Sequence, residues 1–326
     1  MSPSPPKVLV EVDGRQLALS NLDKLLYPPA PGEADGGFTK GQVLDYYSRI
    51  APVLLPHLAG RPLTFKRFPD GVTGKFFFEK NAPSHRPPWL RTTTLPSPGS
   101  TKNRETITYA VLEDLPGLMW AANLATLELH VPMWRVDEAG SALAPDLLVF
   151  DLDPGAPATI VECCVVAGVL RDELAADGLQ AVAKTSGSKG LQLYVPIEDS
   201  GSAAERGRGA APPGSTSAYA RALAQRLETR HPELVVSNMK KDLRGGKVLV
   251  DWSQNNPAKT TVAVYSLRAR PEPTVSTPVT WNEVTGCARA GNPELLRFRS
   301  EQALARVDSL GDLFAGALGP PHPLPG

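Results

Sequence analysis

Two acidic residues at the end of an apolar run are the first candidates for chemistry in this chain. Asp151 and Asp153 follow the run 147–150, and Pro154 and Gly155 then close the segment. Side chains alternate across a strand, so both carboxylates are expected on one face. Neighbouring carboxylates repel each other unless a cation lies between them, and hard divalent cations prefer oxygen ligands. The pair therefore predicts a metal site, with an acidic pair that caps a turn as the alternative.

Two further segments contain residue types that bind phosphate or metal. The loop 186–190, with two glycines, two serines and Lys189, can aim N–H, O–H and ammonium groups at a phosphate. Its spacing differs from that of a Walker loop, and a plain β-turn is the alternative. Asp251 adds a third carboxylate at the end of the apolar run 248–250. Three carboxylates beside a phosphate-binding loop fit nucleotidyl transfer assisted by two metal ions.

Basic and aromatic residues are concentrated locally, although the formal net charge is zero. Residues 61–110 contain nine Lys or Arg against three Asp or Glu, and residues 240–270 contain seven against two. Phe76, Phe77 and Phe78 cannot all face one core from a strand, so at least one is expected in a second layer or at the surface, where a base can stack. A positive groove on a neutral molecule is the hypothesis; solvated charge and core packing of each aromatic are the alternatives.

The elements that must position these residues alternate between strands and helices. We expect a hairpin at 8–19, helix-capping residues at 20–24, and a helix at 40–55 that Pro52 kinks or ends. Loops are expected at 28–37 and 200–217. Further strands are predicted at 63–66, 76–79, 106–111, 128–132, 147–153, 181–185, 191–196, 248–252 and 261–265, and further helices at 118–125, 159–176, 218–230 and from Trp281 onward.

The 326 residues suffice for about two domains. The chain lacks a run of 18 apolar residues and a signal-peptide pattern, so we expect a soluble intracellular protein without a membrane partner. The three cysteines form no CxxC motif, and the five histidines give no zinc spacing. Disulfides and structural zinc are therefore not predicted.

The motifs, taken jointly, resemble the polymerase domain of bacterial ligase D within the archaeo-eukaryotic primase superfamily. The resemblance covers residues 17 to about 310. The segments that match are 19–28, 67–69, 77–80, 130–132, the Asp151 and Asp153 pair, 186–190, 250–255 and 265–268.

This resemblance implies an α+β fold in which an RRM-like antiparallel catalytic sheet is packed with helices and with an N-terminal α/β module. We expect residues 1–134 to form the N-terminal module with a basic and aromatic DNA-binding surface. Residues 135–312 are expected to form the catalytic primase-polymerase module, and residues 313–326 a disordered Pro-rich tail.

The resemblance also implies roles for individual residues. Asp151 and Asp153 would bridge two Mn²⁺ or Mg²⁺ ions, and Asp251 would complete the site of the ion that activates the primer 3′-hydroxyl. His130, alternatively a structural histidine, would lie near an NTP or dNTP substrate. Phe77 and Phe78 would stack on bases. The triphosphate would contact Lys66, Ser186, Lys189, Gln192, Arg244 and Arg268. The downstream 5′-phosphate of a DNA gap would contact Asn21, Lys24 and Lys40. The alternative is that Lys24 and Lys40 are ordinary surface lysines.

One position departs from the family pattern. Where the family has histidine after the loop 186–190, this chain has Gln192. Glutamine can donate a hydrogen bond to phosphate but cannot carry a positive charge. We therefore expect weaker triphosphate binding or altered nucleotide choice.

By the same resemblance the chain is expected to be a stand-alone, monomeric primase-polymerase of the mycobacterial type, cytoplasmic and associated with the nucleoid. It would prefer ribonucleotides and fill gaps in gapped or broken DNA with a 5′-phosphate, beside Ku and a separate ATP-dependent DNA ligase. Two rival hypotheses are a module that bridges DNA ends with little polymerisation and a metal-dependent phosphatase or nuclease. The intact acidic triad argues against the first, and the two separate phosphate-binding sets argue against the second.

Overall fold

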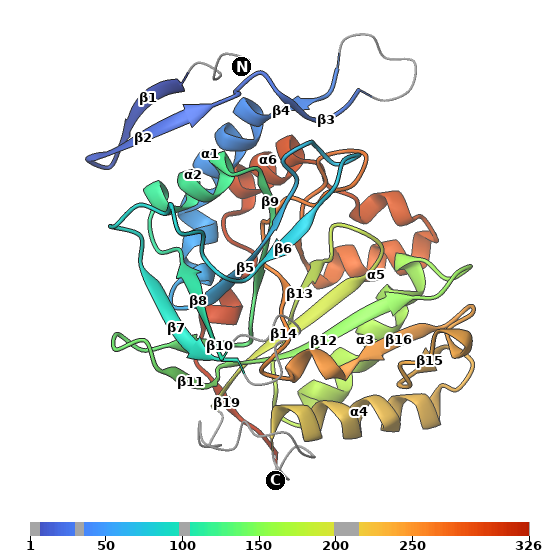
Figure 1. Ribbon diagram of the computed structural model, residues 1–326. Coiled ribbons are helices and arrows are strands. Elements are labelled where there is room, and N and C mark those ends of the chain that lie inside the picture. Colours follow the sequence, from blue (N-terminus) through green and yellow to red (C-terminus); the bar gives the residue numbers. More distant parts are fainter. Residues whose placement is uncertain (1–6, 30–35, 98–104, 199–214, 326) are drawn as a thin grey trace.

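The computed structural model describes residues 7–29, 36–97, 105–198 and 215–325 (Figure 1). Two mainly antiparallel β-sheets lie side by side, and each carries helices. The α+β architecture expected from the sequence is therefore confirmed. The N-terminal strands β1 (Lys7–Val12) and β2 (Arg15–Ser20) form the predicted hairpin, and its turn residues Asp13 and Gly14 have the positive φ angles that a tight turn requires.

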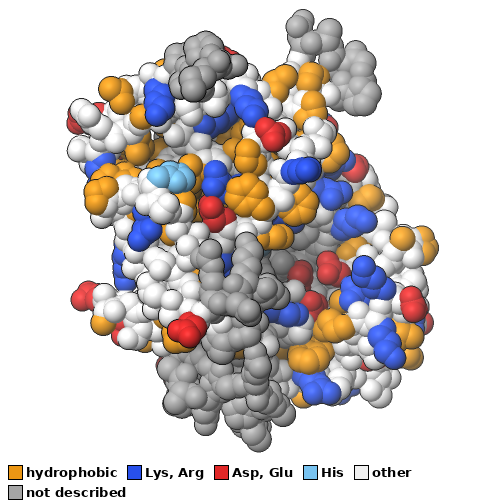
Figure 2. All heavy atoms as spheres, in the orientation of Figure 1, with side chains coloured by type: hydrophobic (Ala, Val, Ile, Leu, Met, Phe, Trp, Pro, Cys, Tyr) orange, Lys and Arg blue, Asp and Glu red, His pale blue; other side chains and the backbone are white. Residues whose placement is uncertain are grey.

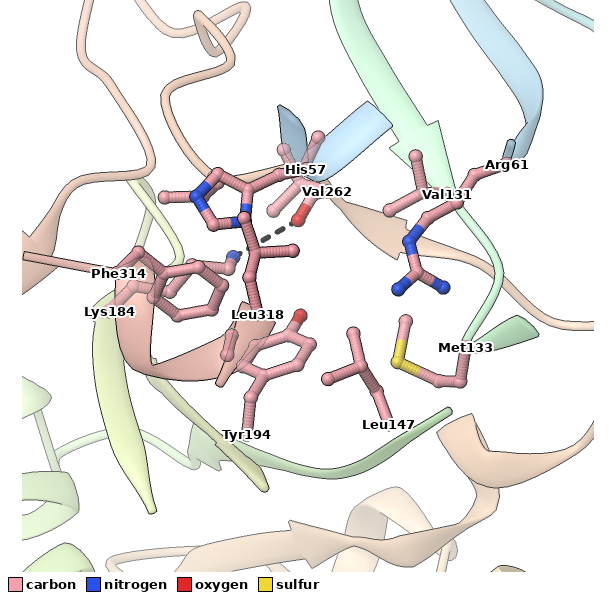
Figure 3. Close-up of a pocket in the computed structure, with 13 residues that line it drawn as sticks. His57, Arg61, Val131, Met133, Leu147, Lys184, Tyr194, Val262, Phe314 and Leu318 are labelled. Atoms are coloured by element: carbon pink, nitrogen blue, oxygen red, sulfur yellow. Dashed lines mark hydrogen bonds between the residues drawn. The ribbon is translucent and has the colours of Figure 1, made fainter. Parts of the chain in front are cut away.

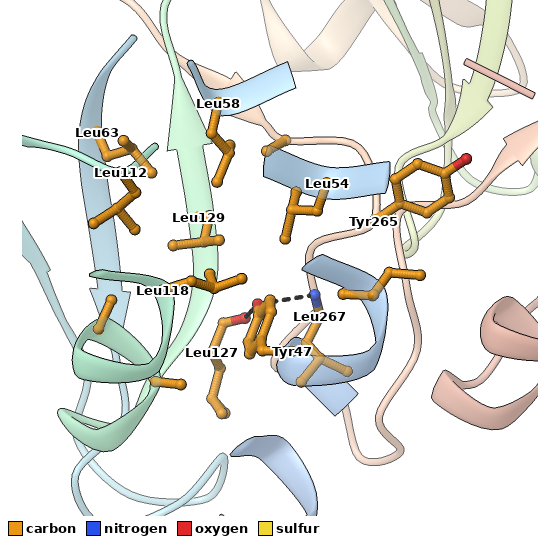
Figure 4. Packing of buried hydrophobic residues seen from close by; sticks show 14 of the residues in the cluster. Tyr47, Leu54, Leu58, Leu63, Leu112, Leu118, Leu127, Leu129, Tyr265 and Leu267 are labelled. Carbon is orange, nitrogen blue, oxygen red and sulfur yellow. Dashed lines mark hydrogen bonds between the residues drawn. The ribbon is translucent and has the colours of Figure 1, made fainter. Parts of the chain in front are cut away.

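The first sheet packs against helices α1 (Lys40–Leu58) and α2 (Leu115–Asn123). Tyr47 of α1 ties this core together, because its hydroxyl donates to Leu127 O at 2.6 Å and accepts from Leu267 N at 3.2 Å (Figure 4). The strand order is β17 (Thr261–Val262), β9 (Thr126–Val131), β5 (Pro62–Arg67), β8 (Thr106–Val111) and β7 (Thr92–Pro96), with β6 (Phe77–Glu79) also paired to β5.

Helix α1 continues past Pro52, where the sequence predicted a kink or an end. Pro52 and Pro56 both lie on the exposed side of the helix, as does Ser48, whose carbonyl lacks an N–H partner at Pro52. Water can bond that carbonyl, while the opposite face buries Ile50, Leu54 and their neighbours. Packing of the apolar face therefore outweighs the missing hydrogen bonds.

The second sheet carries the acidic residues, and α3 (Ile160–Ala176), α4 (Thr216–Arg230) and α5 (Trp281–Ala290) pack into its core. Thr159 begins α3 through a capping box with Glu162, as its sequence indicates. The strand order is β15 (Val235–Val236), β16 (Val248–Asp251), β12 (Leu147–Pro154), β14 (Leu191–Glu198), β13 (Val182–Thr185) and β18 (Pro278–Val279), with β19 (His322–Pro323) parallel to β14.

Contacts between the two sheets join residues on either side of 134/135, the predicted boundary between the two modules. The boundary itself stays a prediction. Strand β17 from the second half of the chain pairs with β9 of the first sheet. The buried Arg61 guanidinium forms two 2.8 Å hydrogen bonds with the Asp146 carboxylate, immediately before β12. Strand β12 is therefore fixed to the first sheet through the buried charge of Arg61, which is paired with Asp146.

Several local predictions were wrong. Residues 20–24 start no helix; they lead into strand β3 (Leu25–Tyr27), which pairs with β4 (Phe38–Thr39). The strand predicted at 261–265 stops at Val262, and the positive φ of Tyr265 is incompatible with an extended strand. Strand β7 and the short pair β10 (Trp134–Val136) and β11 (Ala142–Pro145) were not predicted. Most of the loops predicted at 28–37 and 200–217 lies outside the described residues.

The Pro-rich tail was predicted to be disordered, but its described residues fold onto the protein. After α6 (Ser300–Leu310), Phe314 is 3% exposed and its ring meets the rings of His57 and Tyr194 edge-on. The 3₁₀ helix Ala315–Leu318 and strand β19 follow. Among the described helices, none is long and apolar enough to cross a membrane.

Phe314→Ala is expected to destabilise the protein by about 3 kcal/mol, because it removes a buried aromatic ring and leaves a cavity. Urea unfolding measures the change. Leu310→Ala, at a side chain that is 52% exposed, is the control and is expected to change stability by less than about 0.5 kcal/mol. Equal effects of the two substitutions would show that the tail is not packed as described.

Candidate active site

Strand β12 brings the two predicted carboxylates to one face, with Leu152 buried between them on the other. Asp151 lies opposite Asp251 in the antiparallel register of β12 and β16, so the three acidic residues gather at one end of the sheet. Figure 2 shows acidic side chains within a hollow, with Lys, Arg and hydrophobic side chains around it.

These carboxylates lie close together, and none of them forms an ion pair with a Lys or Arg side chain in the described part of the chain. Burial, the charge of Asp153 and the charge of Asp251 raise the pKa of Asp151 to about 7. Burial and the charge of Asp251 also raise the pKa of Asp153, against the opposing charges of Arg244, Arg268 and Lys189. No described residue forms a hydrogen bond or an ion pair with the Asp153 carboxylate. An arrangement of this kind is stabilised by a bound divalent cation.

Asp251 differs from the other two because its oxygens already have partners. Its Oδ1 accepts from Ser253 N at 2.9 Å and from Ser253 Oγ, and its Oδ2 accepts from Gln254 Nε2 at 2.9 Å. In the described part of the chain, no group of three His, Cys, Asp or Glu side chains has the geometry of a metal site. The oxygen donors of Asp151 and Asp153 fit a hard divalent cation, whereas the place of Asp251 as its third ligand stays a prediction.

A pocket of about 230 Å³ opens beside Asp151 and Asp153. Several predicted substrate-binding residues line it, together with three residues of the segment 260–262. The lining includes His130, Ser186, Ser188, Lys189, Gln192, Thr260, Thr261, Val262 and Arg268. Its volume and its mix of acidic, basic and hydroxyl groups suit a phosphorylated ligand.

The loop 186–190 is a tight turn that is stabilised by hydrogen bonds from its own backbone to the Ser186 side chain. Ser186 Oγ accepts from Ser188 N at 3.2 Å and from Gly190 N at 3.1 Å, and Arg268 Nη1 donates to Ser186 O. A Cβ at Gly187 would lie 2.7 Å from Val275 backbone atoms, and its φ is +65°. Only glycine fits this position, so the close approach of the loop to its neighbours depends on that residue.

Glu128 is a site residue that the sequence analysis missed. It is 1% exposed on β9, and three predicted substrate-binding residues surround it: Lys66 at 3.3 Å, His130 at 2.9 Å and Arg268 at 3.4 Å. Burial alone would raise the pKa of Glu128, but the hydrogen bond to His130 and the charges of Arg268 and Lys66 hold it far below its usual range. Glu128 lies two residues before His130, on the same face of a strand, which is the signal the sequence offered.

The aromatic segment lies at the surface. Phe76, Phe77 and Phe78 are 53%, 44% and 53% exposed, so core packing, the alternative kept open for each, is wrong. Lys66 Nζ lies 4.6 Å from the centre of the Phe76 ring and 5.6 Å from that of Phe78. Aromatic faces beside a lysine offer a stacking platform for bases.

Asn21, Lys24 and Lys40 lie together at the start of α1, outside the pocket lining. Lys24 N donates to Asn21 O at 3.0 Å and Lys40 N to Lys24 O at 2.8 Å. Lys24 Nζ pairs with Asp70 at 3.1 Å, whereas the buried Lys40 Nζ donates to Ser20 O at 2.6 Å. Burial, followed by the charges of Lys24 and Arg67, lowers the pKa of Lys40 to about 8. A bound anion would relieve this repulsion.

Arg244 lies beside the acidic residues, in the segment between the 3₁₀ helix Lys241–Leu243 and β16. Its Nη2 donates to Met239 O at 2.6 Å. A Cβ at Gly155 would lie only 1.9 Å from Arg244 O, so glycine after the Asp153–Pro154 strand end is what allows this segment to pack there.

The two antiparallel sheets and the acidic pair beside this pocket fit a nucleotidyltransferase domain of the polymerase class. Residues 39–314 match the model of the family described as LigD, primase-polymerase domain, and the chain belongs to that family. The resemblance drawn from the motifs and the expected primase fold are therefore confirmed.

Among its relatives is the multifunctional non-homologous end joining protein LigD of Mycolicibacterium smegmatis, 44% identical over 92% of this chain and 36% of that protein. The bifunctional LigD of Bacillus subtilis is 28% identical over 82% of this chain and 39% of its own length. The chain thus spans little more than a third of these relatives. A solved structure of the polymerase domain of Mycobacterium tuberculosis ligase D in complex with DNA matches with a TM-score of 0.79 at 41% identity, over 92% of this chain and 96% of that one.

Proposed function

We propose that this protein is a template-dependent, ribonucleotide-preferring primase-polymerase that fills gaps in broken DNA during non-homologous end joining. The observation that carries the proposal is the pair Asp151 and Asp153, both partly buried, in the lining of a pocket that Lys189 and Arg268 also line. The names of the LigD relatives, and the DNA in the related polymerase-domain structure, support the repair role and the DNA substrate.

Asp151 and Asp153 would bind two Mn²⁺ or Mg²⁺ ions, with Asp251 as a further ligand. Two bound cations supply charge stabilisation at the α-phosphate and lower the pKa of the attacking 3′-hydroxyl. Ser186, Lys189 and the other basic residues of the pocket would hold the triphosphate so that its α-phosphate faces the primer.

The exposed aromatics would orient the substrate bases, and the lysines at the start of α1 would hold a downstream 5′-phosphate. Two phosphate-binding sets at separate positions favour a gap as the substrate over a single DNA end. The nick that remains after gap filling requires a DNA ligase, and a separate ATP-dependent ligase together with Ku are the partners we propose.

Extension of a labelled primer across a short gap tests the proposal. The downstream strand carries a 5′-phosphate, Mn²⁺ is present, and ribonucleotides are compared with deoxyribonucleotides. Extension by the wild type that disappears in Asp151→Ala/Asp153→Ala is the expected result. Tight binding to gapped DNA without extension would reject the polymerase activity and favour end bridging.

Phe78→Ala is expected to weaken nucleotide or template binding by about 1–3 kcal/mol, because one stacking surface is lost. KM for the nucleotide and Kd for gapped DNA measure the change. Leu243→Ala, at a side chain of similar exposure outside the aromatic segment, is the control. An unchanged KM and Kd in Phe78→Ala would remove base stacking from the proposal.

A further inference from the structure

Four polar side chains lie in one row across the catalytic sheet. The registers pair Lys184 of β13 with Gln192 of β14, Gln192 with Asp151 of β12, and Asp151 with Asp251 of β16. Directly opposite residues of antiparallel strands project from the same face, so neighbours in this row contact each other. Lys184 is 1% exposed and Gln192 is 3% exposed. The row therefore runs from the interior of the protein to the pocket.

Hydrogen bonds fix the direction of the Gln192 amide. Burial lowers the pKa of Lys184 well below its usual value, and the charge of Asp151 opposes this shift. In its charged form Lys184 has three donors and no acceptor, and its Nζ finds three acceptors: Gln192 Oε1 at 2.5 Å, Ser276 Oγ at 2.8 Å and Val262 O at 3.0 Å. Tyr194 OH also donates to Gln192 Oε1, at 3.2 Å. Figure 3 shows Lys184 and Tyr194 from neighbouring strands beside a common cavity, with the bond from Lys184 to Val262 drawn. The amide oxygen must therefore face Lys184.

The amide nitrogen consequently faces the acidic pair. Gln192 Nε2 donates to Asp151 Oδ1 at 3.0 Å, whereas Asp151 Oδ2 has no hydrogen bond to any described residue. Both ends of the amide are thus engaged within the protein. A protonated histidine at position 192 would have two donors and no acceptor, and would therefore repel Lys184. Lys184 and Gln192 form a matched pair in this chain.

We propose that Lys184 and Gln192 are positioning residues for Asp151: Lys184 fixes the Gln192 amide, and Gln192 holds Asp151 Oδ1 so that Oδ2 is presented to a divalent cation. In this arrangement Gln192 is not a triphosphate ligand, in contrast to its role expected from the sequence. The inference rests on the proposed metal-dependent function and deepens it.

The test of this pair is Mn²⁺ binding to the full chain without DNA or nucleotide, measured by electron paramagnetic resonance. Gln192→Met and Lys184→Met are each expected to weaken Mn²⁺ binding about 10-fold, the usual effect of losing a group that orients a ligand. The double variant is expected to bind no more weakly than either single variant, because both residues act through one hydrogen bond. Gln225→Met, at an exposed position on α4, is the control for the same chemical change.

Nucleotide kinetics at saturating Mn²⁺ separate the two roles of Gln192. A positioning role leaves the nucleotide KM of Gln192→Met within about twofold of the wild type, whereas a phosphate contact raises KM and leaves Mn²⁺ affinity unchanged. The second pattern, or additive losses in the double variant, would overturn the inference. If Lys184→Met does not fold, the comparison of nucleotide KM with Mn²⁺ affinity in Gln192→Met is sufficient to test the inference. Failure of the wild type to bind Mn²⁺ would instead overturn the metal centre of the proposed function.

Discussion

Asp151→Asn is expected to slow primer extension by about 10³-fold while making the metal-free protein more stable near pH 8. The rate falls because an amide is a neutral, weaker cation ligand, and metal assistance is worth several kcal/mol in the transition state. The shape is retained, since an asparagine oxygen can still accept the hydrogen bond from Gln192. Steady-state extension rates in Mn²⁺ give the first readout.

The stability readout follows from the pKa of Asp151, which burial and the charge of Asp153 raise from 3.8 to about 7. Between about pH 4 and pH 7 the folded protein holds a proton that the unfolded chain has released. The contribution of Asp151 to stability is therefore fully present below about pH 4 and is lost as the pH rises through about 7. Relative to Asp151→Asn, the wild type should lose on the order of a few kcal/mol over this range.

Urea unfolding in a chelating buffer from pH 4.5 to pH 8 measures this difference. Asp172→Asn is the control, because the Asp172 side chain is 71% exposed and its one ion pair among the described residues is with the neighbouring Arg171. Parallel pH curves for wild type and Asp151→Asn would show that Asp151 carries no buried charge. An extension rate near that of the wild type would remove Asp151 from the metal site.

The sequence predicted correctly those elements that are determined by residues close together in the chain. The Asp13–Gly14 turn, the helical spacing of apolar residues in 159–176 and the alternation through Asp151 and Asp153 each act over short stretches of chain, so the hairpin, α3 and the acidic face of β12 were found. The loop 186–190 was found for the same reason. Nucleotide preference and the 5′-phosphate role came from family resemblance alone and stay predictions, as does the number of metal ions, which the three carboxylates suggested.

The features that were missed depend on contacts distant in sequence. Glu128 reads as one charge in an apolar strand, yet it meets Lys66 and Arg268 from far along the chain. Lys184 resembles a surface lysine until β14 and the segment around Ser276 surround it. The tail looked disordered because of its proline content, but the packing of Phe314 against His57 outweighs composition. Burial of a charge cannot be seen before the partner strand is known.

Glu128→Gln tests whether this buried anion organises the cations on one side of the pocket. The substitution removes the only charge in contact with Lys66, His130 and Arg268 within the described structure. It also leaves Lys66, Arg268 and the Ala269 N–H to compete for one neutral amide oxygen. Breaking a buried ion pair on one side costs about 3–5 kcal/mol, so a destabilisation of about 3 kcal/mol is expected in urea.

A second consequence of Glu128→Gln concerns the substrate. Without their common partner, Lys66 and Arg268 repel each other and lose their fixed positions, so KM for the nucleotide is expected to rise about tenfold. Glu294→Gln is the matched control, because Glu294 pairs with Arg297 at 3.5 Å on an exposed surface, where such a pair is worth less than about 1 kcal/mol. A variant that is destabilised but keeps its nucleotide KM would make Glu128 a purely structural anion. A variant that keeps its stability would instead show that Lys66 and Arg268 find other partners within the folded protein.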